Sequence, residues 1–237
     1  MAVNNEVGTI QPIGEMASLL QLHPTIIWHV DGVQAVTTQF HLLLEPRIDC
    51  ISLSAHKFHG VRGVGIFVKK ARVVALPLLY GGGQEFGLRS STENLPAIAA
   101  SAKALRLMVT GKDRQLEIMK QYSLQLKQSL KQNGFVLFGG DETSDHIICT
   151  ALPGIPGEVM LNVFAENNIF ISTTSACSSR AKSSHHTLGQ MKISPKLSKS
   201  AVRLSLSDLT TQVEIDQTLF AIEKIATQFL KTKEQSM

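Results

Sequence analysis

The chain has 237 residues, with 23 lysines and arginines against 19 aspartates and glutamates, and a formal net charge of +4. This length allows one large domain or two small ones, and 43% hydrophobic residues are too many for a disordered protein. The sequence lacks both an apolar run of 18 residues and the start of a secretory signal, so we expect no membrane span and no secretion. The mild positive charge permits contact with acidic partners without requiring it.

The first hundred residues predict an α/β arrangement. A short helix is expected over 14–22, and the apolar run 25–31 is typical of a buried strand that ends in an acid. Further strands are expected over 48–54 and 63–70, the second antiparallel or hairpin-linked. Polar side chains follow the ends of these strands, at Asp31, Ser54, His56 and Lys57. Ligands bind at such strand ends in open α/β sheets, so this edge is the first candidate site.

The rest of the chain alternates helix and strand. A long helical stretch over 95–133 should break near Gly111 and end at Gly134. Strands are expected over 135–139, 146–152, 168–173 and 201–207, and helices over 158–168 and 213–231. The first of these two helices should bury residues among Val159, Leu161, Val163 and Phe164, and the second Ile215, Leu219, Ile222, Ile225, Ala226 and Phe229. A polar loop over 174–194 completes a chain that we divide into domains 1–105 and 106–237.

The three cysteines differ in their surroundings. Their odd number and the absence of a CxxC pair disfavour both a disulfide framework and a four-cysteine zinc site, and fit a reducing, cytoplasmic setting. Cys50 and Cys149 lie in apolar strands, so we expect inert buried thiols. Cys177 lies in a polar loop with basic neighbours, which should lower its pKa and make it reactive. The alternative is an incidental loop cysteine.

Lys57 and Asp31 form a second group of candidate functional residues. Taken alone, Lys57 is as a rule a solvated lysine, and Asp31 could be the N-cap of a helix over 32–36. Together, on two successive strand ends, they match the lysine and aspartate with which proteins hold the aldehyde and ring nitrogen of pyridoxal phosphate. The glycines at 81–83 and the polar residues at 89–92 suit an anion, or form a flexible interdomain loop.

Metal and nucleic-acid sites find little support. His56 and His59 have the spacing of a helical metal pair, but Lys57 between them would repel a cation and no acidic ligand is near. We therefore expect no resident metal. The basic residues are scattered and no aromatic stacking motif is present, which disfavours direct contact with nucleic acid.

Five segments together resemble successive signatures of one family. They are VNNEVG (3–8), HVDGVQ (29–34), SAHKFHG (54–60), GGGQE with RSSTEN (81–94) and SACSS (175–179). Their order and spacing, from Val3 to Arg203, are similar to those of the cysteine desulfurases of the long-loop type. These are class V, fold-type I pyridoxal phosphate enzymes. The resemblance implies part of the large domain, with a mixed and mostly parallel sheet, followed by a small C-terminal α+β domain.

The resemblance also implies how the cofactor would be held. Lys57 would bind pyridoxal 5'-phosphate covalently, and Asp31 would pair with its ring nitrogen. Gln34 and Asn5 would form hydrogen bonds near the phenolic oxygen of the ring. The phosphate would be bound by Ser54 and His56, the latter counted among the catalytic residues, and by Thr92 of the neighbouring subunit in a homodimer.

The implied reaction converts L-cysteine to L-alanine. Arg203 would bind the substrate carboxylate with help from Asn5, and Cys177 would take the sulfur as a persulfide. A scaffold or acceptor protein would receive it for iron–sulfur cluster assembly or tRNA thiolation, and Cys177 could act as a transient iron–sulfur ligand.

Family members are longer than this chain, so we expect part of the large domain to be missing before Met1 and the sheet of residues 1–100 to expose apolar surface. Alternatives are an inactive fragment, a half that needs a complementing partner, or another class V enzyme such as a selenocysteine lyase or an aminotransferase. Ser91 stands where the family has glycine, and we expect strain if that position needs a positive φ.

Overall fold

The computed structural model describes residues 1–173 and 187–234. The chain forms two compact units. The first unit contains Met1–Val3 and Gln11–Lys112, and the second contains Asn4–Ile10 and Asp113–Met237. The boundary expected at 105 falls within the last helix of the first unit, α3 (Leu95–Thr110). The break expected near Gly111 is confirmed, because α4 (Lys112–Gln132) starts directly after it.

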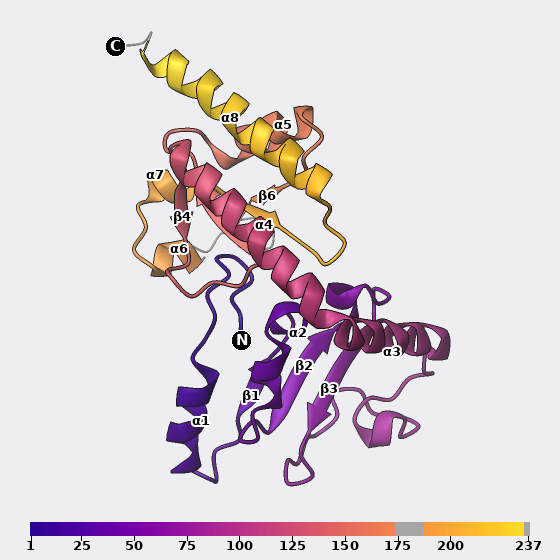
Figure 1. The fold of residues 1–237 in the computed structure, drawn as a ribbon. Coiled ribbons are helices and arrows are strands. Elements are labelled where there is room, and N and C mark those ends of the chain that lie inside the picture. Colours follow the sequence, from indigo (N-terminus) through magenta and orange to yellow (C-terminus); the bar gives the residue numbers. More distant parts are fainter. Residues whose placement is uncertain (174–186, 235–237) are drawn as a thin grey trace. The chain divides into compact units, whose positions relative to one another are not determined.

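The first unit is built around a three-stranded mixed sheet in the order β1-β2-β3 (Figure 1). Its strands are β1 (His29–Asp31), β2 (Cys50–Ser54) and β3 (Gly65–Lys69). The pair β1 and β2 is parallel, whereas β3 runs antiparallel to β2, as the sequence predicted. Besides α3, the helical segments are α1 (Ile13–Gln21), α2 (Ala35–Thr38) and the 3-10 turns η1 (Phe40–Leu44), η2 (Ala55–Phe58) and η3 (Glu85–Gly87).

The strand expected over 25–31 is shorter than predicted. Only His29–Asp31 pairs with β2, and Ile26 and Ile27 are exposed. The carbonyl of Ile26 accepts hydrogen bonds from the guanidinium groups of Arg47 and Arg72 instead of from a neighbouring strand. Because arginine side chains satisfy this backbone, the segment before β1 is a turn.

The second unit is built around a four-stranded antiparallel sheet in the order β4-β5-β7-β6. Its strands are β4 (Val136–Phe138), β5 (Ile147–Ala151), β6 (Ser172–Thr173) and β7 (Ala201–Ser205). Its helices besides α4 are α5 (Gly157–Glu166), α6 (Thr187–Gln190), α7 (Pro195–Ser198) and α8 (Gln212–Glu234).

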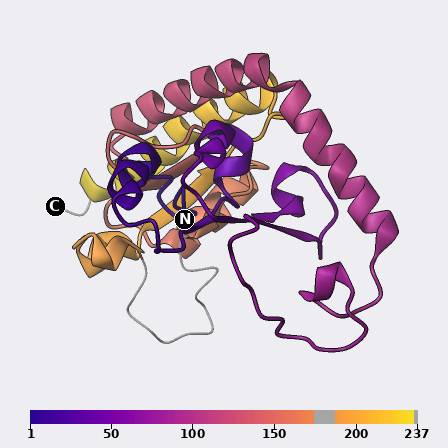
Figure 2. The same cartoon turned by 90° about the horizontal axis from the view of Figure 1, so that it is seen from below.

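Both faces of this second sheet are covered. Side chains alternate along a strand, so Ile148 and Val202 face the core shared with α4, α5 and α8, while Cys149 and Ala201 face the other side. On that side they pack against Leu188 of α6 and against the segment Asn4–Ile10. Figures 1 and 2 show α4 and α8 lying side by side over the sheet. The sheet of the second unit is therefore packed against other elements on both of its faces.

Three predictions for the second unit need correction. The strand expected over 168–173 is reduced to Ser172–Thr173, because Asn168 adopts a φ of +59° and Phe170 is exposed. Helix α5 buries Met160 and Phe164, whereas Val159 is partly exposed. The polar loop expected over 174–194 contains α6 at its end. The apolar side of α8 is confirmed.

Candidate active site

The structure brings the predicted cofactor residues of the first unit to one edge of its sheet. Because β1 and β2 are parallel, their carboxyl ends meet at the same edge, where Asp31 ends β1 and Ser54 ends β2. Turn η2 follows directly and carries His56 and Lys57. Helix α2 packs against this turn, so the two strand ends and their polar side chains form one cluster.

Asp31 is half-buried, and within the described part of the chain only one of its two carboxylate oxygens accepts a hydrogen bond. Its Oδ1 accepts a hydrogen bond of 2.9 Å from the backbone N–H of Val33, and the N–H of Gly32 is bonded to Ser52 of the neighbouring strand. The helix N-cap that the sequence left open is not formed, because α2 starts at Ala35 with Gln34 as its N-cap, and Asp31 stabilises only the turn before it through a single oxygen. Oδ2 remains able to accept from a protonated ring nitrogen, and Gln34 lies buried at the start of α2 beside it.

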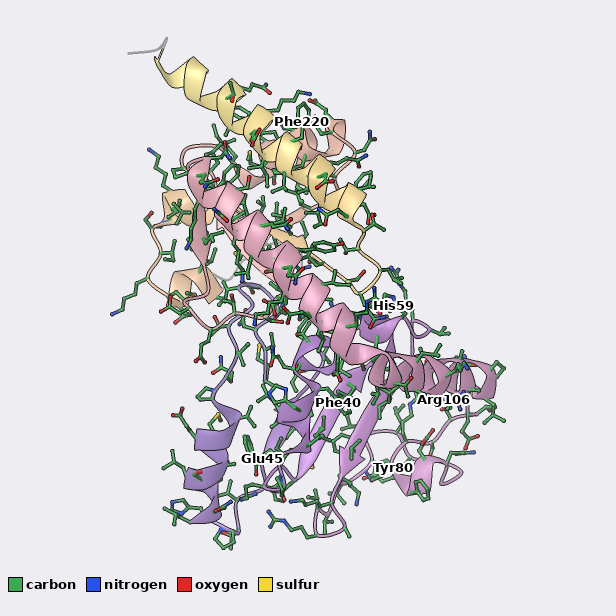
Figure 3. All side chains as sticks on the ribbon, in the orientation of Figure 1. Phe40, Glu45, His59, Tyr80, Arg106 and Phe220 are labelled. Atoms are coloured by element: carbon green, nitrogen blue, oxygen red, sulfur yellow. The ribbon has the colours of Figure 1, made fainter. Side chains whose placement is uncertain are left out.

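A tight turn fixes the position of Lys57. His59 adopts a left-handed φ of +62°, and the N–H of Gly60 closes the turn on the carbonyl of Ala55 at 2.8 Å. A Cβ on Gly60 would lie 2.9 Å from that carbonyl oxygen, so the close approach requires glycine. Phe58 is buried and anchors the turn, which leaves Lys57 half-buried and His56 exposed. His59 marks this turn in Figure 3.

The loop that carries Thr92 is largely exposed. Thr92 itself is exposed, and Asn94 caps α3 by accepting from the N–H of Ala97. Positive φ values occur in this region at Glu85 and Phe86 and not at Ser91, so the strain expected at Ser91 is absent. The structure thus gives Thr92 an accessible position on the surface.

Arg203 lies in the second unit, on β7 next to Cys149 of β5. Its Nη1 donates to the backbone carbonyl of Asn5 at 2.7 Å, whereas its Nε is buried and has no hydrogen-bond partner among the described residues. The carbonyl is presented by a compact turn in which the Asn4 side chain accepts from the N–H groups of Glu6 and Val7, at 2.8 and 3.0 Å.

A guanidinium with a buried, unsatisfied N–H is suited to a carboxylate. An unpaired buried donor costs about 1–3 kcal/mol, so a ligand that accepts from it binds favourably. The structure thus brings Asn5 and Arg203 together, although through the Asn5 backbone and not its side chain. The contact through the Asn5 backbone was not predicted from the sequence, although the Asn4-Asn5 pair is a common turn former.

The cysteines follow the predicted division as far as the structure describes them. Cys50 and Cys149 are buried free thiols, as expected. Burial raises the pKa of both, that of Cys149 to about 12 with a further contribution from the negative charge of Glu6. Cys177 lies outside the described residues. Within residues 1–173 and 187–234, no three His, Cys, Asp or Glu side chains group as metal ligands, and no helix is long and apolar enough to cross a membrane.

Comparison with known proteins identifies the class. Residues 1–218 match the family model for class-V aminotransferases, so the chain belongs to this family. It is 44% identical over 237 residues to a "NifS/IcsS protein homolog" of Lactobacillus delbrueckii subsp. bulgaricus and 33% identical over 228 residues to a cysteine desulfurase of Cereibacter sphaeroides. These matches cover 98% and 96% of this chain, but only 61% and 59% of the relatives.

A solved structure of a NifS-like protein has the same fold. It superimposes with a TM-score of 0.84 at 32% identity, over 96% of this chain and 60% of that protein. The predicted partial fold-type I architecture is therefore confirmed, and the chain spans about three-fifths of the length of the relatives it matches. Members of this family use pyridoxal phosphate. Asp31 and Lys57 lie at the ends of adjacent strands, and Oδ2 of Asp31 can accept a hydrogen bond from a ring nitrogen. This arrangement fits that cofactor.

Proposed function

We propose that the protein carries out pyridoxal phosphate-dependent cysteine desulfuration, in which L-cysteine becomes L-alanine and its sulfur passes to Cys177. The observation that carries the proposal is the placement of Asp31 at the end of β1 and of Lys57 in the turn that follows the adjacent parallel strand β2. Several relatives that the chain matches at 31–35% identity bear the name cysteine desulfurase.

The first unit supplies the cofactor-binding residues. Lys57 would hold the cofactor's aldehyde through its amine, and Asp31 would accept a hydrogen bond from the protonated ring nitrogen through Oδ2. Gln34 would donate toward the ring, and Ser54 and His56 would bind the phosphate. We also assign Asn5, which belongs to the second unit, to the ring. When bound, pyridoxal phosphate withdraws electrons from the substrate's Cα and so weakens the bonds around it.

The second unit supplies the substrate-binding residue. Arg203 binds the substrate carboxylate, and its buried Nε is the donor that this carboxylate satisfies. The bond from Nη1 to the Asn5 carbonyl holds the guanidinium in one orientation. Because a planar guanidinium can donate two parallel hydrogen bonds to a carboxylate, Arg203 fixes the direction of the substrate as well as neutralising its charge.

Cys177 performs the sulfur transfer. Its thiolate attacks the Sγ of the substrate, so that an S–S bond forms while the Cβ–Sγ bond breaks. The bond pair remains with Cβ, which takes up a proton, and the products are L-alanine and a Cys177 persulfide. The thiolate is favoured by the basic residues around Cys177 in the sequence.

The proposed partners follow from the same assignment. The active form is a homodimer in which Thr92 of one subunit binds the cofactor phosphate of the other. The persulfide passes to a sulfur-acceptor or scaffold protein in the cytoplasm, for iron–sulfur cluster assembly or tRNA thiolation. During delivery to a scaffold, Cys177 could also ligate the nascent cluster.

The test is the release of alanine and sulfide from L-cysteine by purified protein with pyridoxal phosphate and a reducing thiol. We expect one alanine per sulfide, no activity in Lys57→Ala, and persulfide on Cys177 detectable by mass spectrometry. Arg203→Lys should raise KM about tenfold, because one of two bonds to the carboxylate is lost. Sulfide release by Cys177→Ala at the wild-type rate, or transamination without sulfide, would contradict the proposal.

A further inference from the structure

The Asn5 carbonyl that holds Arg203 belongs to the same peptide unit as the N–H of Glu6. On one side, the carbonyl accepts from Nη1 of Arg203 at 2.7 Å. On the other side, the Glu6 N–H donates to Oδ1 of Asn4 at 2.8 Å. The peptide is trans, and the C=O and N–H of a planar trans peptide point in opposite directions. The acceptor of the Glu6 N–H therefore fixes the direction of the Asn5 carbonyl.

The side chain of Asn4 holds this peptide from within the turn. Its Oδ1 also accepts from the N–H of Val7 at 3.0 Å, so both lone pairs of the amide oxygen are used. The backbone of Asn4 closes the same turn, because its N–H donates to the carbonyl of Thr9 at 2.9 Å and its carbonyl accepts from the N–H of Gly8 at 3.0 Å. Asn4 is therefore the residue that organises the turn.

The rest of the turn is held independently of the Asn4 side chain. Oγ1 of Thr9 donates to the carbonyl of Gly139 at 2.7 Å, and the N–H of Ser144 donates to a backbone carbonyl of the turn at 2.8 Å. Val7 is buried in the apolar cluster on this face of the second unit's sheet. Because these contacts do not involve the Asn4 side chain, we expect its removal to free one peptide while the turn stays in place.

We propose that Asn4 is a positioning residue for the substrate carboxylate, an inference that rests on the proposed role of Arg203. The Asn4 side chain orients the peptide between Asn5 and Glu6. The carbonyl of that peptide holds Nη1 of Arg203, which leaves the buried Nε for the carboxylate of an α-amino acid. A long side chain loses rotamer freedom when it is fixed, and here the loss occurs before the substrate binds. Asn4 thus raises the affinity for a substrate that it does not touch.

Hydrogen exchange at Nε of Arg203 tests this role without cofactor or substrate. NMR of the full chain with ¹⁵N-labelled arginine measures how fast the Hε of Arg203 exchanges with water, and Arg203→Lys assigns the signal by removing it. We expect Asn4→Ala to speed the exchange about tenfold, because a guanidinium that is no longer held exposes Nε to water. Asn4→Asp keeps an oxygen acceptor for the same two N–H groups and should retain the wild-type rate. An unchanged rate in Asn4→Ala would overturn the proposal.

Kinetics with pyridoxal phosphate and L-cysteine provide the second readout. Asn4→Ala should raise KM about tenfold and leave kcat within about twofold, and Asn4→Asp should restore KM. Asn167→Ala is the matched control. Asn167 is a half-buried residue of the second unit whose side chain bonds to the Val163 carbonyl at 2.8 Å and to Nζ of Lys224 at 2.9 Å, so its loss should change neither the Hε exchange nor KM. A lower kcat with an unchanged KM in Asn4→Ala would contradict the positioning role.

The two readouts separate this inference from the proposed function. If the wild-type chain releases no sulfide but Asn4→Ala still speeds the Hε exchange, the proposed function fails and the hold of Asn4 on Arg203 stands. If sulfide is released and neither the exchange nor KM changes in Asn4→Ala, the positioning role alone fails. If Asn4→Ala does not fold, Asn4→Ser replaces it, because a hydroxyl supports such a turn more weakly than an amide. The Hε exchange should then still increase, and an unchanged rate would overturn the proposal.

Discussion

Asp49 ties three parts of the first unit together. Its side chain is fully buried and accepts from the N–H of Trp28 at 2.9 Å, from Nη1 of Arg47 at 2.7 Å and from Arg72 at 2.7 and 2.8 Å. Burial alone would raise the pKa of this carboxyl. The Trp28 N–H and the guanidinium groups of Arg72 and Arg47 outweigh burial and lower the pKa to about 2. The carboxylate therefore stabilises the folded state.

We predict that Asp49→Asn lowers the free energy of unfolding by about 3 kcal/mol, because it leaves two guanidinium groups without their counter-charge. In the wild type, a pKa lower in the folded state than in the unfolded state gives stability above about pH 4 that is lost as the pH falls toward 2. Urea unfolding followed by the fluorescence of Trp28, the only tryptophan, measures both effects. A variant with the same acid sensitivity as the wild type would contradict this role.

The three thiols should differ sharply in reactivity. We predict that iodoacetamide at pH 7.5 alkylates Cys177 within minutes and leaves Cys50 and Cys149 unmodified in the folded protein. Burial raises the pKa of both buried thiols, that of Cys149 to about 12, so almost no thiolate is present at that pH. Mass spectrometry of peptides gives the site, and Cys177→Ser should abolish the fast reaction. Rapid labelling of Cys149 would show that the second unit opens readily.

Residues of the candidate site were predictable where the signal was local. Asp31 and Lys57 each follow an apolar strand, and that pattern can be read within a few residues. The bond between Arg203 and the Asn5 carbonyl joins positions 198 apart in the chain. Such a contact depends on how two distant segments pack, and the spacing of apolar residues along the chain does not predict it. Motif resemblance suggested the pair, but only the structure shows that the Asn5 backbone makes the bond.

At the scale of elements, the segment Asn4–Ile10 crosses the second unit at Gly139. This glycine has a φ of +111°, its carbonyl accepts from Oγ1 of Thr9 at 2.7 Å, and a Cβ there would overlap the carbonyl oxygen of Val7 and lie 2.7 Å from Cγ2 of Thr143. The close approach of two backbones explains why glycine is required. The same close approach at Gly139 anchors the segment Asn4–Ile10, which presents Asn5 to Arg203.

We predict that Gly139→Ala lowers the stability of the second unit by about 3 kcal/mol or more, from backbone strain and steric overlap together. Gly134→Ala is the matched control: its φ is +79°, but nothing lies within 4 Å of the added Cβ, so about 1 kcal/mol is expected. Thermal unfolding monitored by circular dichroism compares the two. Equal losses in both variants would show that the Val7 contact does not limit this position.

Element prediction succeeded for long periodic segments and failed for short ones. The apolar spacing of α8 extends over many turns, so its buried side could be recognised from the sequence. The apolar runs at 25–31 and 168–173 suggested strands that are mostly turns. Apolar composition alone does not specify a partner strand, and at Asn168 the backbone adopts a left-handed conformation. Helix α7 was missed despite Ser194 as its N-cap and Pro195 at its first position.

At the scale of the whole molecule, the apolar surface is unevenly distributed. The first unit exposes Val74, Leu76 and Leu78 by more than 80% each, in addition to the half-exposed Phe67 and Val68. A contiguous apolar patch on a soluble protein marks a surface that another molecule covers, or one that promotes aggregation. The predicted exposure of apolar surface in residues 1–100 is therefore present in the structure.

We predict that the chain alone associates as its concentration rises and binds a hydrophobic dye strongly. The double substitution Leu76→Lys and Leu78→Lys should reduce dye fluorescence several-fold and shift sedimentation toward the monomer, because it places charges in the patch. Leu209→Lys, at an exposed residue of the second unit, is the control and should change neither measurement. The prediction is contradicted if the wild-type chain stays monomeric, binds little dye and unfolds in a single cooperative transition. The exposed apolar surface would then not require a binding partner. If the double variant still binds the dye as strongly as the wild type, the apolar surface that binds the dye lies elsewhere in the first unit.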